Sequence, residues 1–579
     1  MPSISRNMLS KWSSYHLTSE GRYVPQRITD PGFSRVMSYP DGSIRETATI
    51  FCADAASLPG PAAFSATGER LKTFLADVID PPQRMFKMDP AQDCIPIGRG
   101  WSFAKLIGAR DMQIDLTGLS NIAGFEAADL ALSSPFDPGR VVLVGGGTRL
   151  RELTNWAQRR NLSIMTSGTH LGPTIAGGFG TASHGSRLGF GGLQNMIRGI
   201  HLITGPTSSV WIERRSQPLF NSTATDMFSD RTIYDDAVFE DALIHLGAMG
   251  IVNGVAVELV DDDGFSLFVT EGNVGATWLD QVAAGAFATI ADALGKPGDA
   301  PVFYEVTIDP VQWHTTPAIH TMYFPAISLL PDTDIPPAEF RFADLLAGYV
   351  TALQEYQQSQ EPAASSGEQG LAGMEVSAGL PSAFKLYRDA LFAQDIVKHP
   401  PQHAKWNQLH GDEITGGYPG ALYNASFAVN RHSIPEIVPL ICEATKGLPS
   451  TFLFTIRFVS NAAGTLAFTR FPETAVIEID GISRRAPLVG PMLGGAIETG
   501  ARRIRECLDG ENAAGKKFEY SMHWAKLGDL DAAKVERDFG PSGDPDSPLG
   551  RWRATRESLL DPALHSLFRS EALTTYGLV

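Results

Sequence analysis

Residues 168–192 (GTHLGPTIAGGFGTASHGSRLGFGG) hold nine glycines in one stretch. Glycine lacks a Cβ, so its backbone can approach a ligand closely, and successive N–H groups can converge on phosphate oxygens. Ordering these glycines costs roughly 0.5–1 kcal/mol each relative to alanine. Packing explains two or three of them easily but not all nine. We therefore interpret the stretch as a binding segment for an extended, phosphate-bearing cofactor.

A second glycine turn, Gly98–Ser102, follows the short apolar run Cys94–Ile97. Arg99 could add positive charge there and Ser102 a hydroxyl donor. A tight turn between two strands is the alternative, and this segment alone favours neither interpretation. Neither glycine segment has the G-x-G-x-x-G or G-x-x-x-x-G-K-[ST] spacing. A nicotinamide cofactor on a Rossmann fold therefore fits the sequence poorly.

The elements around these segments alternate between strands and helices, which indicates an α/β or α+β architecture. A strand at Arg140–Val144 runs into three glycines and then a helix at Thr148–Asn161. Further on, a strand, a helix and two strands predict a second domain with a sheet covered by helices. These four elements are Leu422–Val429, Ile434–Thr445, Thr451–Val459 and Thr474–Ile479. The other expected strands are Cys94–Ile97, Met112–Leu116, Gly199–Ile203, Ile251–Val260 and Val302–Ile308, and the other expected helices are Glu69–Ile79 and Phe239–Leu246.

Composition narrows the class of protein. A chain of 579 residues exceeds one hydrophobic core, so two or more domains are expected. The net charge of −17, with no run of basic residues, argues against a nucleic-acid partner. The four cysteines have no metal-site spacing, so we expect a reducing compartment and no bound metal. Because no secretory signal or membrane span is visible, we expect a cytoplasmic protein without membrane contact.

Five segments together resemble a known family. IGRGWSFAKL, VLVGGGTRLRELTNWAQRRNLSI and TIAGGFGTASHGSRLGFGGLQNMIRGIHLITG are similar to the FAD-binding domain of flavoproteins of the vanillyl-alcohol oxidase and p-cresol methylhydroxylase type. FEDALIHLGAMGIVNGVAVELV resembles the segment that closes this domain. MHWAK resembles the His-Trp-Gly-Lys element of the alditol oxidase and aldonolactone (gulonolactone-type) oxidase branch. The resemblance is good over residues 90–260 and patchy over 420–526.

The resemblance implies an α+β fold with a split, two-subdomain FAD-binding domain and an α/β cap domain on an antiparallel sheet. Residues 1–262 would form the FAD-binding domain, with its motifs at 90–260. Residues 263–504 would form the cap, including a flexible insertion at 354–373 that is polar and poor in large apolar residues. Residues 505–579, expected to be rich in helix, would return to the FAD-binding domain.

The resemblance also assigns cofactor contacts. The pyrophosphate would lie against Ile97, Gly98, Arg99, Gly100, Trp101 and Ser102. The second segment would follow the pyrophosphate, ribityl chain and isoalloxazine through Gly168, Thr174, Gly177, Gly178, Thr181, Ser183, His184, Gly185 and Ser186. The adenine side would meet Gly250, Ile251 and Val252, and His523 would lie at the flavin. Relatives often attach FAD through a histidine at the position of Trp101, so noncovalent FAD is expected here. Attachment through His184 is the alternative to a role for it in supporting the loop.

For catalysis, the resemblance points to a Glu-x-Arg pair on a cap strand, which here reads Thr455-Ile456-Arg457. Residues two apart on a strand share a face, so Thr455 and Arg457 should both point into the site. The missing carboxylate could come from Glu478 on the next strand, paired with Arg457. Alternatively, Glu478 borders solvent on an edge strand. Lys526 would place an ammonium near the substrate hydroxyl or the flavin, and the alternative is a surface cation.

Three further histidines, His170, His201 and His245, are expected to be core residues with satisfied hydrogen bonds. The expected activity is that of an FAD-dependent oxidase or dehydrogenase on CH–OH groups. It would transfer hydride from an alcohol, polyol or lactone-type small molecule to flavin N5, with oxygen or another acceptor reoxidising the flavin. The alternative is a flavin- or hydrophobic-ligand-binding protein, or a non-redox cyclase, on the same fold. The sequence predicts no oligomeric state.

Overall fold

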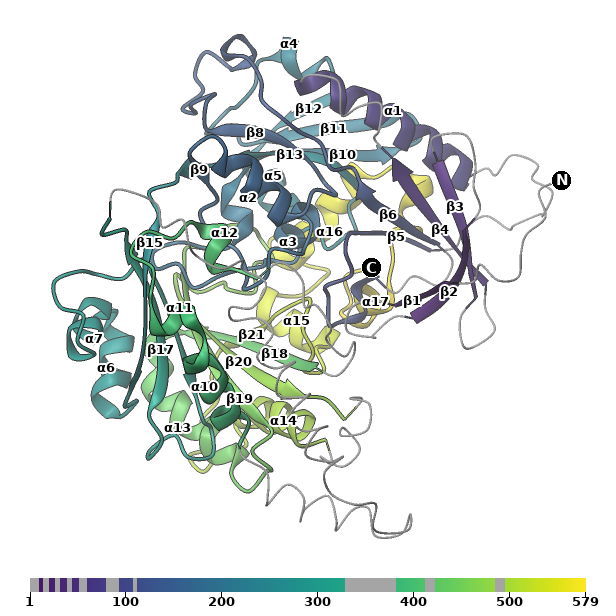
Figure 1. Ribbon diagram of the computed structural model, residues 1–579. Helices are drawn as coiled ribbons and strands as arrows, with labels where there is room; N and C mark the ends of the chain where they lie inside the picture. Colours follow the sequence, from purple (N-terminus) through teal and green to yellow (C-terminus); the bar gives the residue numbers. More distant parts are fainter. Residues whose placement is uncertain are drawn as a thin grey trace.

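The structure is a computed structural model. It describes residues 10–13, 20–25, 32–38, 44–51, 60–79, 93–107, 112–328, 382–411, 422–484 and 495–579, with backbone only for the strands before residue 52. The insertion expected at 354–373 lies outside these ranges. Within them, the strands form sheets of six, six and seven strands and a separate two-stranded pair. Both six-stranded sheets precede residue 262, and the seven-stranded sheet follows it (Figure 1).

The first sheet, at the right of Figure 1, carries the first glycine turn at its edge. Its order is β1-β2-β3-β4-β6-β5, antiparallel up to β4 and parallel from there on. The edge strand β5 ends at Ile97, so the turn Gly98–Ser102 begins where the sheet stops. The strands are β1 Ser10–Ser13, β2 Glu20–Pro25, β3 Gly32–Ser38, β4 Ile44–Phe51, β5 Cys94–Ile97 and β6 Met112–Gly118.

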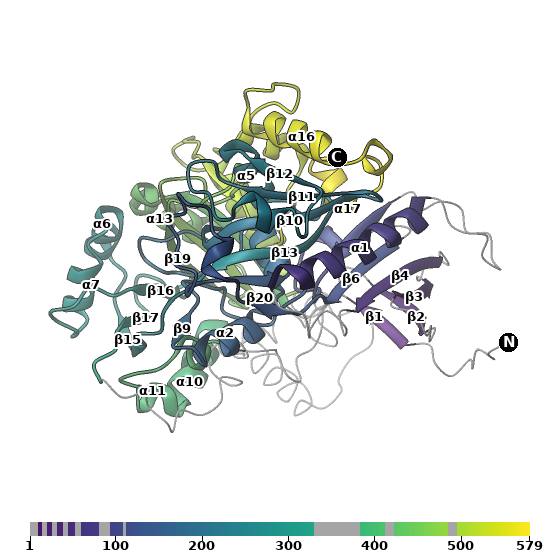
Figure 2. The same cartoon turned by 90° about the horizontal axis from the view of Figure 1, so that it is seen from above.

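The second sheet has the order β12-β11-β10-β13-β8-β7. Successive residues of a strand point to opposite faces, and apolar residues on both faces of this sheet pack against helices. Leu143 and Ala256 share a cluster with Phe64 of helix α1, whereas the next residues along each strand pack with Phe179 and Phe239 of α3 and α5. Figure 2 shows α1 lying along this sheet. The strands are β7 Ile122–Ala123, β8 Val141–Gly145, β10 Ile197–Gly205, β11 Ser208–Glu213, β12 Arg231–Tyr234 and β13 Ile251–Glu258, and the two-stranded pair is β9 Leu162–Ser163 with β14 Val260–Asp261.

The third sheet is antiparallel throughout, in the order β15-β17-β16-β19-β20-β18-β21. Helix α14 covers one face: a Cβ on its Gly500 would lie 3.1 Å from Ile479 and 3.5 Å from Phe452. The opposite face is the one that bears the polar residues considered below. The strands are β15 Phe265–Gly272, β16 Phe303–Ile308, β17 Ala318–Pro325, β18 Leu422–Asn430, β19 Phe452–Ser460, β20 Glu473–Ile482 and β21 Tyr520–Met522.

The helices lie mainly around the second and third sheets (Figure 1). Those up to residue 260 are α1 Gly60–Ile79, α2 Leu150–Gln158, α3 Ile175–Gly180, α4 Ser222–Thr225 and α5 Asp236–Leu243. Those that accompany the third sheet are α6 Ala276–Ala284, α7 Phe287–Ala293, α10 Ala383–Ala393, α11 Asp395–Lys398, α12 Trp406–Leu409, α13 Ile434–Thr445 and α14 Ala496–Leu508. The C-terminal helices are α15 Ala532–Phe539, α16 Pro548–Leu559 and α17 Glu571–Thr575.

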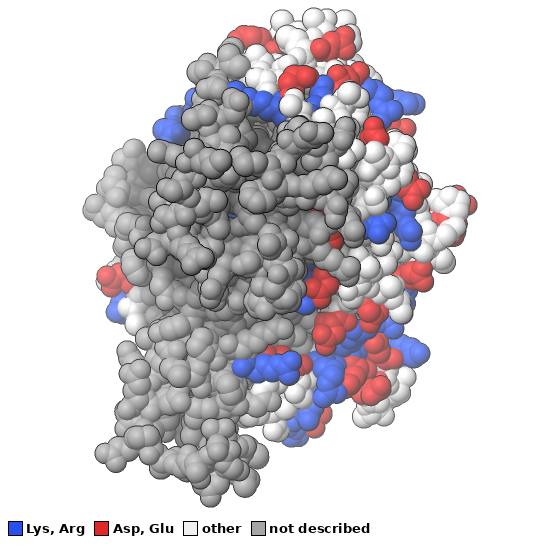
Figure 3. Space-filling view, turned by 90° about the vertical axis from the view of Figure 1, so that its right-hand side faces the viewer, with Lys and Arg blue, Asp and Glu red and all other residues white. Residues whose placement is uncertain are grey.

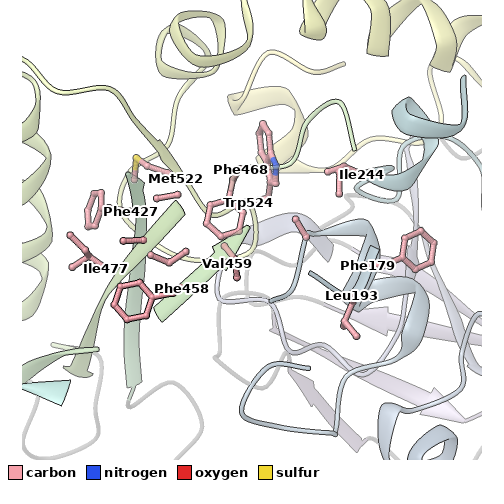
Figure 4. Close-up of a cluster of buried hydrophobic side chains, with 14 of the residues drawn as sticks. Phe179, Leu193, Ile244, Phe427, Phe458, Val459, Phe468, Ile477, Met522 and Trp524 are labelled. Carbon is pink, nitrogen blue, oxygen red and sulfur yellow. The ribbon is translucent and has the colours of Figure 1, made fainter. Parts of the chain in front are cut away.

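One hydrophobic cluster joins the third sheet to the second glycine segment. Phe427 and Ile477 of the sheet and Phe179 near the glycines belong to the same buried cluster, with Trp524 between them (Figure 4). Trp524 is fully buried, and its indole N–H donates to the Leu466 carbonyl at 2.7 Å. The two parts of the chain therefore share a core, which fixes the sheet relative to the glycine-rich backbone.

The predicted succession of strand, helix, strand and strand in the second half of the chain is confirmed by β18, α13, β19 and β20. The helix predicted at Phe239–Leu246 is wrong at both ends. It begins at Asp236, capped by Asp235, and stops at Leu243, because Leu246 and Gly247 adopt φ values of 52° and 76°, which no helix contains. The mixed helix and sheet architecture is confirmed. The domain boundaries stay a prediction, and the chain still adds β21 to the third sheet after residue 505.

Along the described ranges, no helix combines the length and apolar character that crossing a membrane requires. On the face shown in Figure 3, basic and acidic side chains of the described residues lie interspersed, without a patch of one sign.

Candidate active site

A cleft with a cavity volume of about 310 Å³ brings the two glycine segments and the polar face of the third sheet together. Small-ligand pockets typically measure about 300–1,000 Å³, so this cleft has the size of a small-ligand site. Its walls include Gly98 and Trp101 from the first segment and Thr174 and His184 from the second.

The two glycine segments meet at Gly98. A Cβ there would lie 2.3 Å from Thr174 Oγ1, so only glycine allows this approach. Thr174 in turn begins α3, where its Oγ1 accepts a hydrogen bond from the Gly177 N–H at 3.3 Å. Gly100 turns the first segment along the cleft wall with a φ of 70°, a left-handed conformation that suits glycine. The contact therefore couples the shape of one wall to that of the other.

Protein packing explains more of the nine glycines than the sequence suggested. A Cβ would meet protein atoms at 2.2–2.7 Å at five of them: Gly178, Gly180, Gly185, Gly191 and Gly192. Gly168 differs, because it lines the cleft and an added Cβ would meet its nearest protein atom only at 3.8 Å, whereas a Cβ on Gly177 would lie 3.1 Å from Thr174 Oγ1. The case for a bound cofactor therefore rests on the cleft that these residues line and not on the number of glycines.

Most of the predicted cofactor contacts do line the cleft. They are Ile97, Gly98, Arg99, Gly100, Trp101, Ser102, Gly168, Thr174, Gly177, Gly178, Thr181, Ser183, His184, Gly250, Val252 and His523. Three others lie outside its lining. Ile251 alternates with its neighbours along β13 and points into the core. Gly185 packs against the Ser167 carbonyl, and Ser186 bonds the Tyr304 carbonyl and the Phe458 N–H, so it ties the loop to the third sheet.

The floor of the cleft is one face of four neighbouring strands, β18, β20, β19 and β16. Directly opposed residues of antiparallel strands share a face, so the register decides which side chains meet there. Glu478 opposes Thr455 and Ser426, while Asp480 opposes Leu453 and Asn424. Arg457 opposes Glu305 on β16. The floor residues that line the cleft are Leu422, Asn424, Leu453, Thr455, Arg457, Glu478, Asp480 and Glu305.

Arg457 is the centre of this floor. Its Nη1 lies 3.0 Å from Glu478 Oε2 and its Nε 3.0 Å from Glu305 Oε2, and Nη2 donates to Thr169 Oγ1 at 2.8 Å. The predicted pairing of Arg457 with Glu478 is therefore present. Burial would raise the pKa of Glu478, but the charges of Arg457 and Lys526 outweigh it and hold the pKa below its ordinary value.

The edge-strand alternative for Glu478 is wrong, because β20 lies between β19 and β18 and the side chain is only 4% exposed. Asp480, two residues on, has the opposite character: burial, then the negative charge of Glu478, raise its pKa to about 7. Asn424 donates a short hydrogen bond from its amide to Asp480. Two neighbouring carboxyl groups with separated pKa values are typical of sites that move protons.

Lys526 reaches the cleft from the loop after β21. The loop is held by the Ala525 carbonyl, which accepts from the Phe103 N–H at 2.8 Å and the Ala104 N–H at 3.1 Å. The Lys526 ammonium lies 4.6 Å from the centre of the Phe103 ring. Burial lowers its pKa, although Glu478 and Asp480 oppose this. The lysine thus belongs to the cleft wall next to the first glycine segment, and the surface-cation alternative does not describe it.

Two buried histidines near this floor have fixed tautomers when neutral. His184 Nδ1 must donate to the Gly185 carbonyl at 3.0 Å, which leaves its Nε2 as an acceptor. His523 Nδ1 accepts from the Ala525 N–H at 3.1 Å, so its proton lies on Nε2. Burial lowers the pKa of His184 to about 4 and that of His523 well below its ordinary value. Both rings therefore enter any reaction uncharged.

His170 is not the core residue that the sequence suggested. It lines the cleft, its ring lies 5.0 Å from that of Trp101, and its Nδ1 is buried without a hydrogen-bond partner among the described residues. His245 does have both ring nitrogens bonded, to the Ala176 carbonyl and the Gly247 N–H, although it also borders the cleft. His201 is a core residue as predicted, and its Nδ1 bonds Asn253, but its Nε2 is buried without a hydrogen-bond partner among the described residues, so its hydrogen bonds are not all satisfied. An orphaned nitrogen in the wall is what a site shaped for a ligand would leave.

The buried histidines predict steep loss of stability in acid. Folding lowers their pKa from 6.5 to about 3 or 4, so between these values the unfolded chain binds more protons than the folded one. Each histidine then removes up to about 1.4 kcal/mol of unfolding free energy per pH unit as the pH falls below about 6.5. The residues concerned are His184, His201, His245, His320 and His410.

Urea unfolding followed by circular dichroism across this range measures the effect. We expect a drop of several kcal/mol on going from neutral pH to about pH 5. In a His201→Gln variant, the unfolding free energy should depend less steeply on pH, by an amount that corresponds to at most one bound proton. A slope that stays flat below pH 6.5 would contradict the burial of these rings.

The sequence missed further polar residues of the cleft. These are Thr169, Glu305, Tyr387, Asn424 and Asp480. The sequence could have indicated Glu305, because it is the one charged residue in the six-residue strand β16. It could also have indicated Asp480, which lies two residues after Glu478 on β20 and so shares its face. For Thr169 and Tyr387 the sequence offers no such signal. Among the described residues, no three side chains of the metal-ligating types gather as a metal site would require.

Comparisons with known proteins agree with the resemblance seen in the sequence, because the fold is similar to that of cholesterol oxidase and part of the chain is similar to a lactone dehydrogenase. Cholesterol oxidase from Brevibacterium sterolicum superimposes over 99% of both chains with a TM-score of 0.60, at 12% identity. A solvent-stable cholesterol oxidase covers 94% of this chain and 98% of its own, also with a TM-score of 0.60 and 12% identity. At this identity the likeness concerns the fold alone.

In sequence, the chain is similar to L-gulono-1,4-lactone dehydrogenase of Mycobacterium tuberculosis, strains H37Rv and CDC 1551. The identity is 25% over 164 residues, which is 28% of this chain. The matched segment spans 31% of that relative's length. No family model matches the chain.

Proposed function

We propose that this chain is an FAD-dependent oxidoreductase that oxidises a CH–OH group of a small molecule. The observation that carries this proposal is the arrangement of the cleft: a buried Arg457–Glu478 pair and Lys526 face two glycine-lined walls. FAD, when bound, supplies flavin N5 as the acceptor of a hydride. The sequence relative is a dehydrogenase of a lactone, and this supports a substrate among alcohols, polyols and lactones.

The residues present fit such a cofactor. Gly168 leaves space at the cleft wall, since its nearest protein atom would lie 3.8 Å from an added Cβ, and His170 offers a ring nitrogen without a hydrogen-bond partner among the described residues. Arg99 in the first segment suits pyrophosphate oxygens, whereas the Ser102 hydroxyl donates to the Ala104 carbonyl at 2.8 Å; Thr181–Ser183 with His184 suit the flavin ring. Trp101 at the usual attachment position supports noncovalent binding, with His184 Nε2 as the nitrogen that a covalent link would use.

In the proposed reaction the chain holds charge and moves a proton. Arg457 and Lys526 stabilise the negative charge that develops on the substrate oxygen or at the flavin. Glu478 and Glu305 hold the Arg457 side chain in place through both edges of the guanidinium. Thr455 stands where relatives carry a glutamate, so the carboxylate function falls to β20. Oxygen or another acceptor would complete the cycle.

The test is an anaerobic screen. The protein is loaded with FAD, and bleaching of the oxidised-flavin absorbance is followed against a library of alcohols, polyols, lactones and phenols. Bound flavin that one substrate class bleaches supports the proposal. Stable flavin binding with no reduction by any compound would favour the alternative of a binding protein or non-redox cyclase. The replacement of the relatives' glutamate by Thr455 supports this alternative. A protein that stays colourless after loading contradicts both flavin readings.

Substituting Lys526 tests the role of its charge. Lys526→Met should lower the rate of flavin reduction about 10²–10³-fold, as expected when one group that stabilises transition-state charge is removed. FAD should remain bound, and Lys526→Arg should recover part of the rate. The matched control is Lys105→Met, an exposed lysine paired with Glu571, which should leave the rate unchanged. Equal effects of both methionine variants would contradict the assignment.

A further inference from the structure

Asp480 is a floor residue to which neither the sequence motifs nor the proposed function gives a role. It lies on β20 two residues after Glu478, so both carboxyl groups point to the same face of the sheet. Both line the cleft. On the neighbouring strands, Asp480 opposes Leu453 and Asn424, and these two residues also line the cleft.

The two carboxyl groups differ in what their oxygens contact. Glu478 Oε2 is held by Arg457 at 3.0 Å, and Oε1 accepts from Ser426 Oγ at 3.3 Å. An anion held at both oxygens, one of them by an arginine, is stabilised as an anion and is therefore a weak base. Asp480 Oδ1 accepts from the Asn424 amide, and within the described ranges no further hydrogen bond to Asp480 occurs. Its second oxygen is therefore available to a molecule in the cleft.

The charges that face Asp480 come from every surrounding element. Glu478 lies on its own strand, Arg457 on β19 and Lys526 on the loop after β21, and the phenol of Tyr387 on α10 is close enough to interact with it. Burial, followed by the repulsion of Glu478, raises the pKa of Asp480 to about 7, while Lys526 and Arg457 act against this. A general base works best when its pKa lies near the working pH, and Asp480 meets this condition while Glu478 does not.

We propose that Asp480, rather than Glu478, is the general base that accepts the hydroxyl proton of the substrate. The O–H bond breaks toward the Asp480 carboxylate while the C–H bond breaks with its electron pair as hydride, and a C=O bond forms. The two electrons leave with the hydride to the flavin that the proposed function supplies, so the inference rests on that function. With Asp480 protonated, the two remaining floor carboxylates, Glu305 and Glu478, balance Arg457 and Lys526.

An infrared titration of the FAD-loaded protein tests the proton-holding part of this inference without turnover. The band of a protonated carboxyl group should disappear with a midpoint near pH 7 in the wild type. Asp480→Asn should remove this band. Glu478→Gln should move its midpoint to lower pH, because the repelling neighbour is gone. A band near pH 7 that survives in Asp480→Asn overturns the assignment.

The pH profile of anaerobic flavin reduction tests the catalytic part. In the wild type the rate should rise with pH to a plateau through one ionisation near pH 7. Asp480→Asn should lower the plateau about 10²–10⁴-fold, the usual contribution of a general base, and abolish this rise. Asp480→Glu should retain the rise. Asp529→Asn, a change of an exposed aspartate in the loop that carries Lys526, is the matched control and should behave as wild type.

Glu478→Gln decides the matter if Asp480→Asn fails to fold. If the flavin-reduction rate of Glu478→Gln still rises with pH, with its midpoint at lower pH, the result supports Asp480 as the base. If the rate of this variant no longer rises with pH, Glu478 is the base and the inference is overturned. A wild-type protein that binds no FAD, or whose flavin no substrate reduces, contradicts the proposed function instead. The infrared band near pH 7 then still reports on Asp480 by itself, so the two failures are distinguishable.

Discussion

Replacing Arg457 with methionine should destabilise the fold by about 3–5 kcal/mol and abolish flavin reduction. The guanidinium contacts Glu305 and Glu478 at 3.0 Å each, and both carboxylates are buried. Removing it takes away the arginine that both buried carboxylates pair with, and this is far more unfavourable than losing an exposed ion pair. The substrate oxygen would also lose a cation in the floor. Urea unfolding and anaerobic stopped-flow reduction measure the two effects.

A triple variant separates the two effects. Arg457→Met combined with Glu305→Gln and Glu478→Gln removes the stranded charges, so most of the lost stability should return. Flavin reduction should stay absent, because the cation is still missing. If the single variant is as stable as wild type, the buried ion pairs of the floor do not exist as described. If the triple variant regains activity, Arg457 does not act on the reaction.

Replacing Gly98 with alanine should weaken FAD binding about 10–100-fold. The new methyl group would lie 2.3 Å from Thr174 Oγ1, and overpacking of this kind typically costs about 1–3 kcal/mol, with each 1.4 kcal/mol equal to a tenfold change in affinity. Either wall must move, and Thr174 is also the residue that begins α3. Equilibrium dialysis against FAD measures the dissociation constant.

The matched variants make this prediction specific. Thr174→Ala removes the two atoms nearest to the new methyl group, so Gly98→Ala with Thr174→Ala should bind FAD better than Gly98→Ala alone. Gly124→Ala is the neutral control, because no atom lies within 4 Å of its added Cβ and its φ is not positive. An unchanged FAD affinity in Gly98→Ala would show that the meeting of the two segments does not shape the site.

The sequence alone predicted much of the fold because local patterns carry it. The apolar runs before glycine turns predicted β5 and β8, and the succession of strand, helix, strand and strand after residue 420 predicted β18, β19 and β20. The i, i+2 rule placed Thr455 and Arg457 on one face, and the structure puts both in the cleft. The displaced carboxylate, Glu478, was predicted on the next strand because the resemblance implies a glutamate that Thr455 replaces.

The contacts of Arg457 that the sequence did not predict depend on how strands and loops distant in the sequence pack together. Glu305 and Arg457 are 152 positions apart, and nothing local fixes them as opposed residues of β16 and β19. Thr169 reaches Arg457 only because the second glycine segment folds over the sheet. The glycine count misled in part, since close packing against protein atoms requires five of the nine. Local spacing therefore finds which residues can act, and tertiary contacts decide which of them meet.

The most direct test of the account is a crystal structure of the protein grown with FAD. The account predicts electron density for the whole cofactor in the cleft, with the pyrophosphate against Gly98–Ser102 and the isoalloxazine between His184 and the floor around Arg457. Clear density for the walls with no cofactor between them, or FAD bound elsewhere on the protein, would contradict it.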